Sequence, residues 1–264
     1  MATKLKQNLL QADPDANGPP RIGGMSETGY TGLKVASKHI LEEAHSRWRM
    51  PQRIRTVDEM MEEGYLSAAI NLYVDMLSQV PWQVKPPVGA SAKAKERAKM
   101  VDSCRDDMEQ SWECFMRNAL TNQLYGFSVI EKTYKYRLRG KSRYDDGAVG
   151  IKSLSPRAQS TLDGWEFSDD GRNLTAFIQR IQDIQYSERF NNLSGEPVRI
   201  PREKFLLFTT KSSNGNPEGI PPLKAAYYAW RMKQEVENQE LLGASRDLSG
   251  LFHIQIPAAY MNPD

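Results

Sequence analysis

The fold is decided by a nine-residue turn, Asn214-Gly-Asn-Pro-Glu-Gly219-Ile-Pro-Pro222, and by the helix expected after it. Gly and Pro dominate this turn, and Pro is well tolerated in the first turn of a helix. No Gly or Pro follows between residues 223 and 242, where helix-forming residues dominate. The sequence therefore predicts a helix of about 22 residues, which would be about 33 Å long.

The two halves of this predicted helix differ in polarity. Residues 223–230 are apolar and aromatic, whereas residues 233–240 are almost wholly polar. A helix segment that is polar on all sides is rarely part of a single-chain core. We expect the first half to pack on the rest of the chain and the second half to project into water and against partner helices.

The composition describes a polar and nearly neutral chain. It has 264 residues, a mean hydropathy of −0.62 and a formal charge of +2, from 35 basic and 33 acidic residues. This balance does not predict the basic surface of a tight nucleic-acid binder. No apolar run approaches the roughly 18 residues of a membrane span, and the N-terminus lacks the apolar core of a signal peptide. Cys104 and Cys114 lie about 15 Å apart along an expected helical stretch, which is too far for a disulfide.

The pattern upstream of the turn predicts an α+β domain. Residues 1 to about 30 are polar and rich in Gly and Pro, which is typical of an arm without a core of its own. Helices are expected over residues 33–48, over residues 56–80 with Thr56 as N-cap, and over residues 91–124 with a break near Ser103. Strands are expected at residues 82–85, 127–138, 150–154, 164–167, 174–178, 181–186, 198–201 and 205–209. Hairpin turns between them predict a mostly antiparallel sheet flanked by helices.

Several residue sets approach catalytic or binding motifs but lack a required member. Residues 126–133, Gly-Phe-Ser-Val-Ile-Glu-Lys-Thr, match the phosphate-binding loop except that Glu131 replaces its second glycine, and a carboxylate there would repel phosphates. His39 and His45 would lie about 120° apart on a helix, and a single Glu-x-x-His motif does not make a di-metal site.

Acidic pairs stand at residues 106–107, 145–146 and 169–170. Two of these three pairs are followed by a turn glycine, where Asp is expected for its backbone hydrogen bonds. We therefore predict a protein that is not an enzyme and has no cofactor and no metal site.

Taken in order, several segments resemble a tailed-bacteriophage portal protein, the ring subunit at the capsid vertex. The segments are VDEMM (57–61), AAINL (68–72), VPW (80–82), YGFSVIE (125–131), SPR (155–157), WEFSDDG (165–171), IPREKF (200–205), GNPEGIPPL (215–223), WRMK (230–233) and LFHIQIP (251–257). Their order and spacing over residues 55–257 carry the resemblance, rather than any single motif. Residues 220–222, Ile-Pro-Pro, depart from the family, which usually has a small polar residue and then aliphatics here.

The resemblance implies an order of domains along the chain. Residues 1–50 would be an extended arm, residues 51–218 an α+β wing, residues 219–246 the stem helix, and residues 247–264 the start of a clip region. Portals of this type continue through a second stem helix, a channel loop and a helical crown. We therefore expect this sequence to be a fragment of a longer protein.

The resemblance further implies a structural role in the virion. Twelve subunits would surround a channel for double-stranded DNA at the portal vertex, after assembly in the host cytoplasm and without a membrane. The implied partners are the major capsid protein, the terminase large subunit and a head–tail adaptor. The candidates to face DNA or the channel are Lys224, Arg231, Lys233 and Glu237. Salt bridges between subunits are the alternative role for each of them.

Two other functions stay open from the sequence. One is a different head–tail connector or a scaffold protein, which a ring count by electron microscopy would distinguish. The other is a magnesium-dependent nuclease built on the acidic pairs, for which metal-dependent cleavage lost on Asp145→Ala would be the sign.

Overall fold

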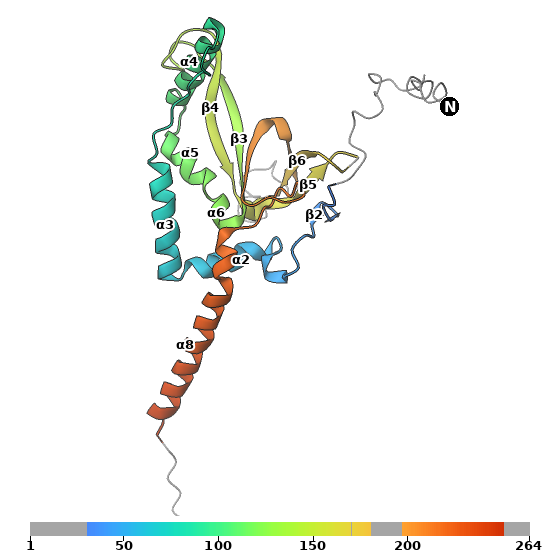
Figure 1. The fold of residues 1–264 in the computed structure, drawn as a ribbon, viewed down its shortest axis with the longest axis vertical. Coiled ribbons are helices and arrows are strands. Elements are labelled where there is room, and N and C mark those ends of the chain that lie inside the picture. Colours follow the sequence, from blue (N-terminus) through green and yellow to red (C-terminus); the bar gives the residue numbers. More distant parts are fainter. Residues whose placement is uncertain (1–30, 170, 181–196, 251–264) are drawn as a thin grey trace, which may run out of the picture.

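A computed structural model describes residues 31–169, 171–180 and 197–250. Figure 1 shows an elongated body of helices and strands, from one end of which a single long helix projects. We call the described residues up to position 221 the body. The projecting helix is α8 (Tyr227–Leu248), and the short 3-10 helix η4 (Pro222–Ala226) leads into it.

The strands form two three-stranded antiparallel sheets and one small hairpin. In the first sheet the order is β4 (Val149–Arg157), β3 (Phe127–Tyr136), β8 (Phe205–Thr209). In the second sheet it is β5 (Leu162–Phe167), β6 (Leu174–Gln179), β7 (Val198–Pro201). The hairpin pairs β1 (Val35–Ala36) with β2 (His39–Ile40). The predicted α+β class with antiparallel strands is confirmed, and the strands divide between two sheets.

The helices lie along one side of the first sheet and below it (Figure 1). The α-helices of the body are α2 (Gln52–Met61), α3 (Gly64–Ser78), α4 (Ala92–Asp106), α5 (Trp112–Ala119) and α6 (Asn122–Tyr125). Short 3-10 helices are η1 (Ser46–Trp48), η2 (Gln159–Thr161) and η3 (Arg202–Lys204). Ser91 and Ser111 cap α4 and α5, because their hydroxyls accept hydrogen bonds from backbone N–H groups of the first turn. No helix within the described ranges is both long enough and apolar enough to cross a membrane.

Three apolar clusters hold these elements together. One joins the two sheets and contains Phe127, Trp165, Phe177 and Phe205, whose rings meet mostly edge to face. A second packs α5 on the first sheet through Phe115, Ala119, Ile130 and Leu154. The third joins η1 and α2 to the start of α8 through Trp48, Val57, Met60, Leu223, Tyr227 and Trp230. The third cluster fixes where α8 leaves the body.

Two predicted helices were wrong in position. The helix over residues 33–48 is replaced by the β1–β2 hairpin and η1, because Ser37 and Lys38 adopt left-handed φ angles of 49° and 71° and turn the chain. Thr56 does not cap a helix. It lies buried inside α2, where its hydroxyl donates to the carbonyl oxygens of Gln52 and Arg47.

Other boundaries also differ from the sequence pattern. The helix expected up to residue 80 is broken between α2 and α3, where Glu63 is extended. Residues 82–85 form no strand. The break expected near Ser103 lies after Asp106 instead, and Ser111 starts the next helix. The predicted strand at 181–186, Asp170, the arm residues 1–30 and the clip residues 251–264 lie outside the described residues.

Candidate functional site at the base of the projecting helix

A buried ion pair fixes the turn that leads into α8. Arg53 on α2 and Glu218 in the turn are each about 4% exposed or less, and Arg53 Nη2 lies 3.5 Å from Glu218 Oε2. Arg53 Nη1 also donates to the carbonyl oxygens of Glu218 (3.0 Å) and Tyr125 (3.1 Å), and Arg53 Nε donates to that of Trp48 (2.8 Å). One guanidinium therefore connects η1, α6 and the turn.

The Glu218 carboxylate has a second buried partner in the second sheet. Trp165 Nε1 donates to Glu218 Oε1 at 3.2 Å, and the Glu218 backbone N–H donates to Asn216 Oδ1 at 2.8 Å. We call Arg53, Trp165, Asn216 and Glu218 the hub. Burial raises the pKa of Glu218 although Arg53 opposes this, and burial lowers the pKa of Arg53 although Glu218 opposes it. Removing one partner would leave the other buried without its counter-charge.

The backbone around the hub is packed so closely that two positions require glycine. Gly126 has a φ of 93°, and a Cβ there would lie 2.5 Å from the carbonyl oxygen of Glu218. Gly219 has a φ of 53°, and a Cβ there would lie 2.4 Å from the carbonyl oxygen of Thr210. The backbone N–H of Thr210 donates to Gly126, and that of Ile220 donates to Thr210. The end of α6, the end of β8 and the turn thus meet without space for side chains.

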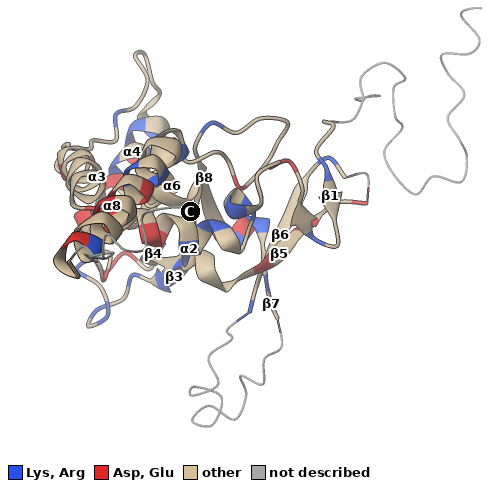
Figure 2. Cartoon of the chain, turned by 90° about the horizontal axis from the view of Figure 1, so that it is seen from below, with Lys and Arg blue, Asp and Glu red and all other residues tan. Residues whose placement is uncertain are grey.

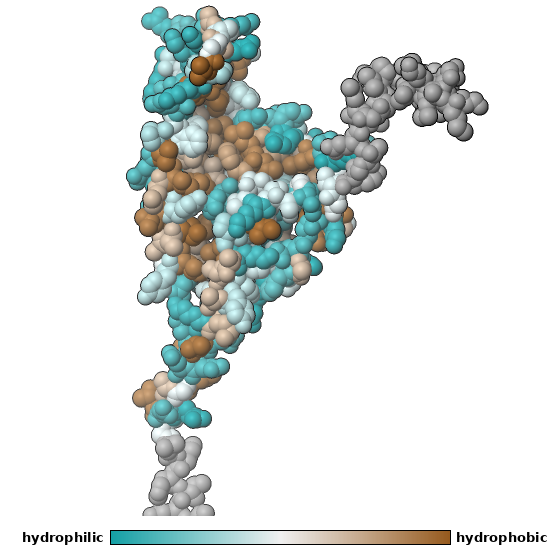
Figure 3. Space-filling model, in the orientation of Figure 1, coloured by the Kyte–Doolittle hydropathy of each residue, from teal (hydrophilic) through white to brown (hydrophobic). Residues whose placement is uncertain are grey.

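Beyond this base, α8 leaves the body. Leu223, Tyr227 and Trp230 are buried, whereas every residue from 231 to 250 is exposed. The first half therefore packs on the body and the second half projects from it, as predicted, while the predicted contact with partner helices stays a prediction. The helix continues past the predicted end at residue 242 and includes Gly243. Figure 3 shows both hydrophilic and hydrophobic residues on the surface of the projecting part.

The structure separates the four residues predicted to face a channel. Lys224 in η4 forms an ion pair with Glu43 of the body, and its side chain is 32% exposed. Lys233 Nζ lies 2.6 Å from Glu63 Oε1 at the start of α3 and 3.4 Å from Glu237 Oε1. Arg231 Nη2 is 3.9 Å from Glu235 Oε1 on its own helix. These contacts connect Lys224 and Lys233 to the body but leave Arg231 on α8.

The two body carboxylates in these ion pairs lie close to the base of α8. Burial alone would raise the pKa of Glu43, but hydrogen bonds from Lys224 and from the His45 backbone N–H hold it below its ordinary value of 4.5. The contact with Glu63 raises the pKa of Lys233. In the single chain, Lys224 thus fastens η4 to the body, and Lys233 fastens α8 to it.

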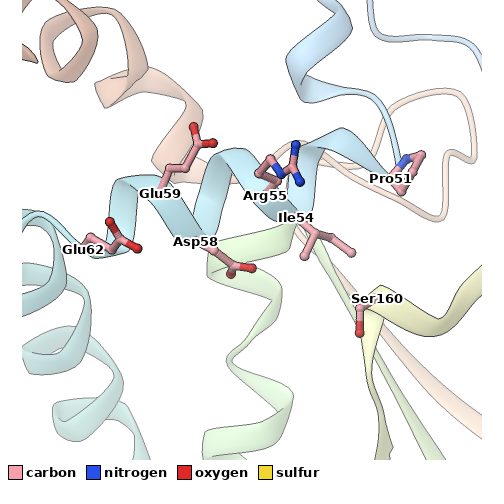
Figure 4. Close-up of a pocket in the computed structure, with 7 residues that line it drawn as sticks. All are labelled: Pro51, Ile54, Arg55, Asp58, Glu59, Glu62 and Ser160. Carbon is pink, nitrogen blue, oxygen red and sulfur yellow. The ribbon is translucent and has the colours of Figure 1, made fainter. Parts of the chain in front are cut away.

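An open cavity of about 490 Å³ lies against the exposed face of α2. Its lining residues are Pro51, Ile54, Arg55, Asp58, Glu59, Glu62 and Ser160 (Figure 4). Asp58 Oδ1 accepts a hydrogen bond from the Tyr125 hydroxyl at 2.9 Å, and burial together with this carboxylate raises the pKa of Tyr125 to about 12. Glu59 lies 3.5 Å from Arg47. Two of the carboxylates that line the cavity therefore already have partners within the body.

The motifs that approached catalytic patterns have structural roles. Gly126 ends α6, and the residues after it lie in β3 rather than in a phosphate-binding loop. Glu131 pairs with Arg157 on β4, with Arg157 Nε 2.8 Å from Glu131 Oε2. Asp107 is buried and paired with Lys135. No group of three or more His, Cys, Asp or Glu side chains suited to a metal ion occurs within the described ranges.

The sequence did not reveal the hub. Arg53 and Glu218 are 165 residues apart, and each looks like an ordinary surface residue in its local pattern. The only local signal is a charged residue between Pro217 and Gly219 in a tight turn, where a side chain can be directed inward. The pairing itself becomes visible only when α2, α6 and the turn are brought together.

The sequence matches one protein family, described as the portal protein of Mu bacteriophage, over residues 54–238. A search of curated proteins found no match. One similar solved chain belongs to the virion of a native gene transfer agent particle, with 13% identity, a TM-score of 0.45, and coverage of 78% of this chain and 52% of that chain. Another belongs to the neck of an empty gene transfer agent particle computed with C6 symmetry, with 12% identity, a TM-score of 0.45, and coverage of 78% and 54%. The present chain thus spans about half the length of those two chains.

Proposed function

The chain belongs to the family of Mu bacteriophage portal proteins, and on this basis we propose that it is the wing and first stem helix of a ring subunit at the capsid vertex. In this proposal the body is the wing and α8 is the stem. Residues 1–50 are an arm, and residues from 247 onward start the clip. About twelve copies surround a channel through which double-stranded DNA passes, and the role is structural, with no catalytic step.

The observation that carries the ring is the distribution of apolar residues on α8. Tyr228, Met232 and Val236 are exposed and repeat every four residues, which places them along one side of the helix. We call them stripe A. Leu241 and Leu248 are exposed, seven residues apart, and continue the side on which Trp230 packs against the body. We call Leu241 and Leu248 stripe B.

The two stripes lie on opposite sides of α8, roughly 165° apart at 100° per residue. A helix with one apolar side packs on one partner, whereas a helix with two opposite apolar sides can contact two. Contacts between unlike faces of identical subunits are heterologous, and they close into a ring when the rotation between subunits allows it. This pattern supports a circle of stem helices in which stripe A of one subunit meets stripe B of the next.

The same geometry supports different roles for the candidate channel residues. Arg231 and Lys233 are two residues apart and therefore roughly 200° apart around the helix, on the two sides between the stripes, and the exposed Leu242 shares the side of Arg231. Lys233 and Glu237 share the side that faces Glu63 of the body. We therefore place Arg231, and not Lys233 or Lys224, toward the channel. A nearly neutral lining suits a channel because each added phosphate contact would hold DNA that must slide.

The proposed partners follow from the position of such a ring. The wing would contact the major capsid protein, the terminase large subunit would dock during packaging, and a head–tail adaptor would dock afterwards. The virion is the expected location, after assembly in the host cytoplasm. Each of these partners is a proposal to be tested with the complete protein.

Electron microscopy of the purified complete protein tests the ring, with closed rings of about twelve subunits expected. A packaging assay then tests the channel assignment: Arg231→Glu should slow DNA packaging by rings that still assemble, whereas Lys233→Gln should leave packaging close to wild type. Normal packaging by the Arg231→Glu and Lys233→Gln double variant would overturn the assignment. Open assemblies, or a position elsewhere in the virion, would favour a different connector or a scaffold.

A further inference from the structure

Positive charge is concentrated at the end of the body farthest from α8. Residues 92–99 at the start of α4 and residues 137–148 between β3 and β4 together carry eight Lys and Arg against three Asp and Glu. Their net charge of +5 exceeds the +2 of the whole chain, so the remaining residues are net negative. Figure 1 shows α4 and this end of the β3–β4 pair together, opposite the projecting helix, and Figure 2 shows Lys and Arg on α4.

Six of these cations form what we call the basic tip. They are Lys93, Lys95, Arg97, Lys99, Lys141 and Arg143, all of them exposed. None of the six forms an ion pair with any residue in the described part of the chain. Of the nearby carboxylates, Asp107 pairs with Lys135 and Asp146 pairs with the buried Arg137, whereas Glu96 and Asp145 form no ion pair with described residues. The tip therefore carries more positive charge than the carboxylates of these two segments can balance.

The two segments of the tip are fastened to one another. Arg137 Nη1 donates to Ser103 Oγ on α4 at 3.0 Å. At the end of α4, Asp107 accepts hydrogen bonds from the Arg143 backbone N–H at 2.9 Å and from the Ser142 hydroxyl at 2.7 Å. Because the β3–β4 connection is held on α4 in this way, its cations and those of the helix lie at the same end of the body.

The chemistry of this surface fits a nucleic-acid backbone better than a protein. Four of its six cations are lysines, and lysine is depleted in protein–protein interfaces. Interfaces with DNA are much more positively charged, and exposed cations without a fixed bidentate arrangement contact phosphates without reading sequence. Along α4, Lys93 and Arg97 are four residues apart, as are Lys95 and Lys99, so each pair repeats along its own side of the helix with a rise of about 6 Å, and the two sides are roughly 200° apart.

We propose that the basic tip binds the phosphate backbone of double-stranded DNA, without sequence preference, at a site separate from α8. This site does not depend on a ring, because all six cations come from one chain. DNA held here would lie against the end of the wing that is remote from the stem. The proposal therefore gives the subunit a second DNA-binding surface, outside the channel.

The test measures binding of a fluorescently labelled 30-base-pair DNA duplex to the full chain by anisotropy, across a series of salt concentrations. The tip variant carries Lys93→Glu, Arg97→Glu, Lys141→Glu and Arg143→Glu. We expect its affinity for DNA to fall by at least about tenfold. The slope of log affinity against log salt should become shallower by about 0.9 for each phosphate that the variant no longer neutralises. Circular dichroism should report an unchanged fold because all four side chains are exposed.

The control reverses four cations outside the tip, Lys34→Glu, Lys38→Glu, Arg55→Glu and Lys204→Glu, which are exposed and give the same change in net charge. The proposal expects this variant to bind more tightly than the tip variant and with a steeper salt slope. Equal weakening by both variants would overturn the proposal, because it would mean that only net charge matters. So would binding of the chain to polyglutamate but not to the duplex, which would indicate an acidic protein partner. Ring assembly is measured separately and does not affect either result.

Discussion

At the scale of single residues, Gly126 shows how little space separates the body from the turn before α8. Its left-handed φ and the nearby Glu218 carbonyl are two separate obstacles to a side chain. Gly126→Ala should therefore lower the free energy of unfolding by about 3 kcal/mol or more, measured by urea denaturation. Gly140→Ala is the matched control, because its φ of 85° is similar but nothing lies within 4 Å of the added Cβ. That variant should lose only about 1 kcal/mol, and equal losses at both sites would contradict the close contact.

Asp107 allows a prediction of pH dependence. Burial would raise its pKa, but the Arg143 backbone N–H, the Ser142 hydroxyl and Lys135 hold it below the ordinary value of 3.8. A lowered pKa means that the stabilisation is present above the unfolded-state value and is lost as the pH falls through the folded-state value. Asp107→Asn should cost about 2–3 kcal/mol near neutral pH, and its difference from wild type should shrink below about pH 3.8.

Denaturant unfolding at several pH values measures this difference. Asp145→Asn is the control, because Asp145 is exposed and accepts only a local hydrogen bond from the Arg139 backbone N–H. It should change stability by about 0.5 kcal/mol or less at any pH. A difference between wild type and Asp107→Asn that stayed constant down to strong acid would show that the carboxylate charge is not the source of the stabilisation.

At the scale of elements, the sequence predicted best where one strong local signal acts alone. The strands from residue 127 to residue 209 have β-branched and aromatic residues between turn residues, and those in the described ranges were confirmed. The helix after Pro222 was confirmed because nothing interrupts it. The helices before residue 80 were misplaced because tertiary contacts determine where they begin. Thr56 lies buried inside α2, where its hydroxyl donates to the Arg47 carbonyl oxygen, so the capping pattern around it does not start a helix.

The start of α8 allows a prediction at this scale. The Lys233–Glu63 contact joins α8 to α3, whereas the ion pair of Arg231 stays within α8. Lys233→Gln should therefore speed amide hydrogen exchange in the first turns of α8 by less than about tenfold, as expected for an exposed ion pair. Arg231→Gln should change exchange there much less. Hydrogen exchange read by mass spectrometry distinguishes the two, and equal effects would mean that the contact with Glu63 does not hold the helix.

At the scale of the whole molecule, composition was the least informative guide. A net charge of +2 gave no reason to expect a basic surface, because a sum over the whole chain does not show where its positive and negative side chains are concentrated. The basic tip depends on the packing of residues 137–148 against α4, which no local pattern predicts. The two sides of α8 could in principle be counted from the sequence, but which residues stay exposed depends on where the helix leaves the body.

The last prediction concerns how whole subunits meet. If stripe A of one subunit packs on stripe B of the next, Val236→Glu and Leu241→Glu should each block ring assembly, because each places a charge in one of the two faces. Mixed together, they should form dimers that neither forms alone, since the first variant still has an intact stripe B and the second an intact stripe A. Only one such contact can form per pair, so no ring should follow. Mass photometry of the separate and mixed variants measures this, with Asn238→Glu, which lies between the two stripes, as the control that should still assemble. A mixture that stayed monomeric while the control formed rings would mean that the two stripes do not meet each other.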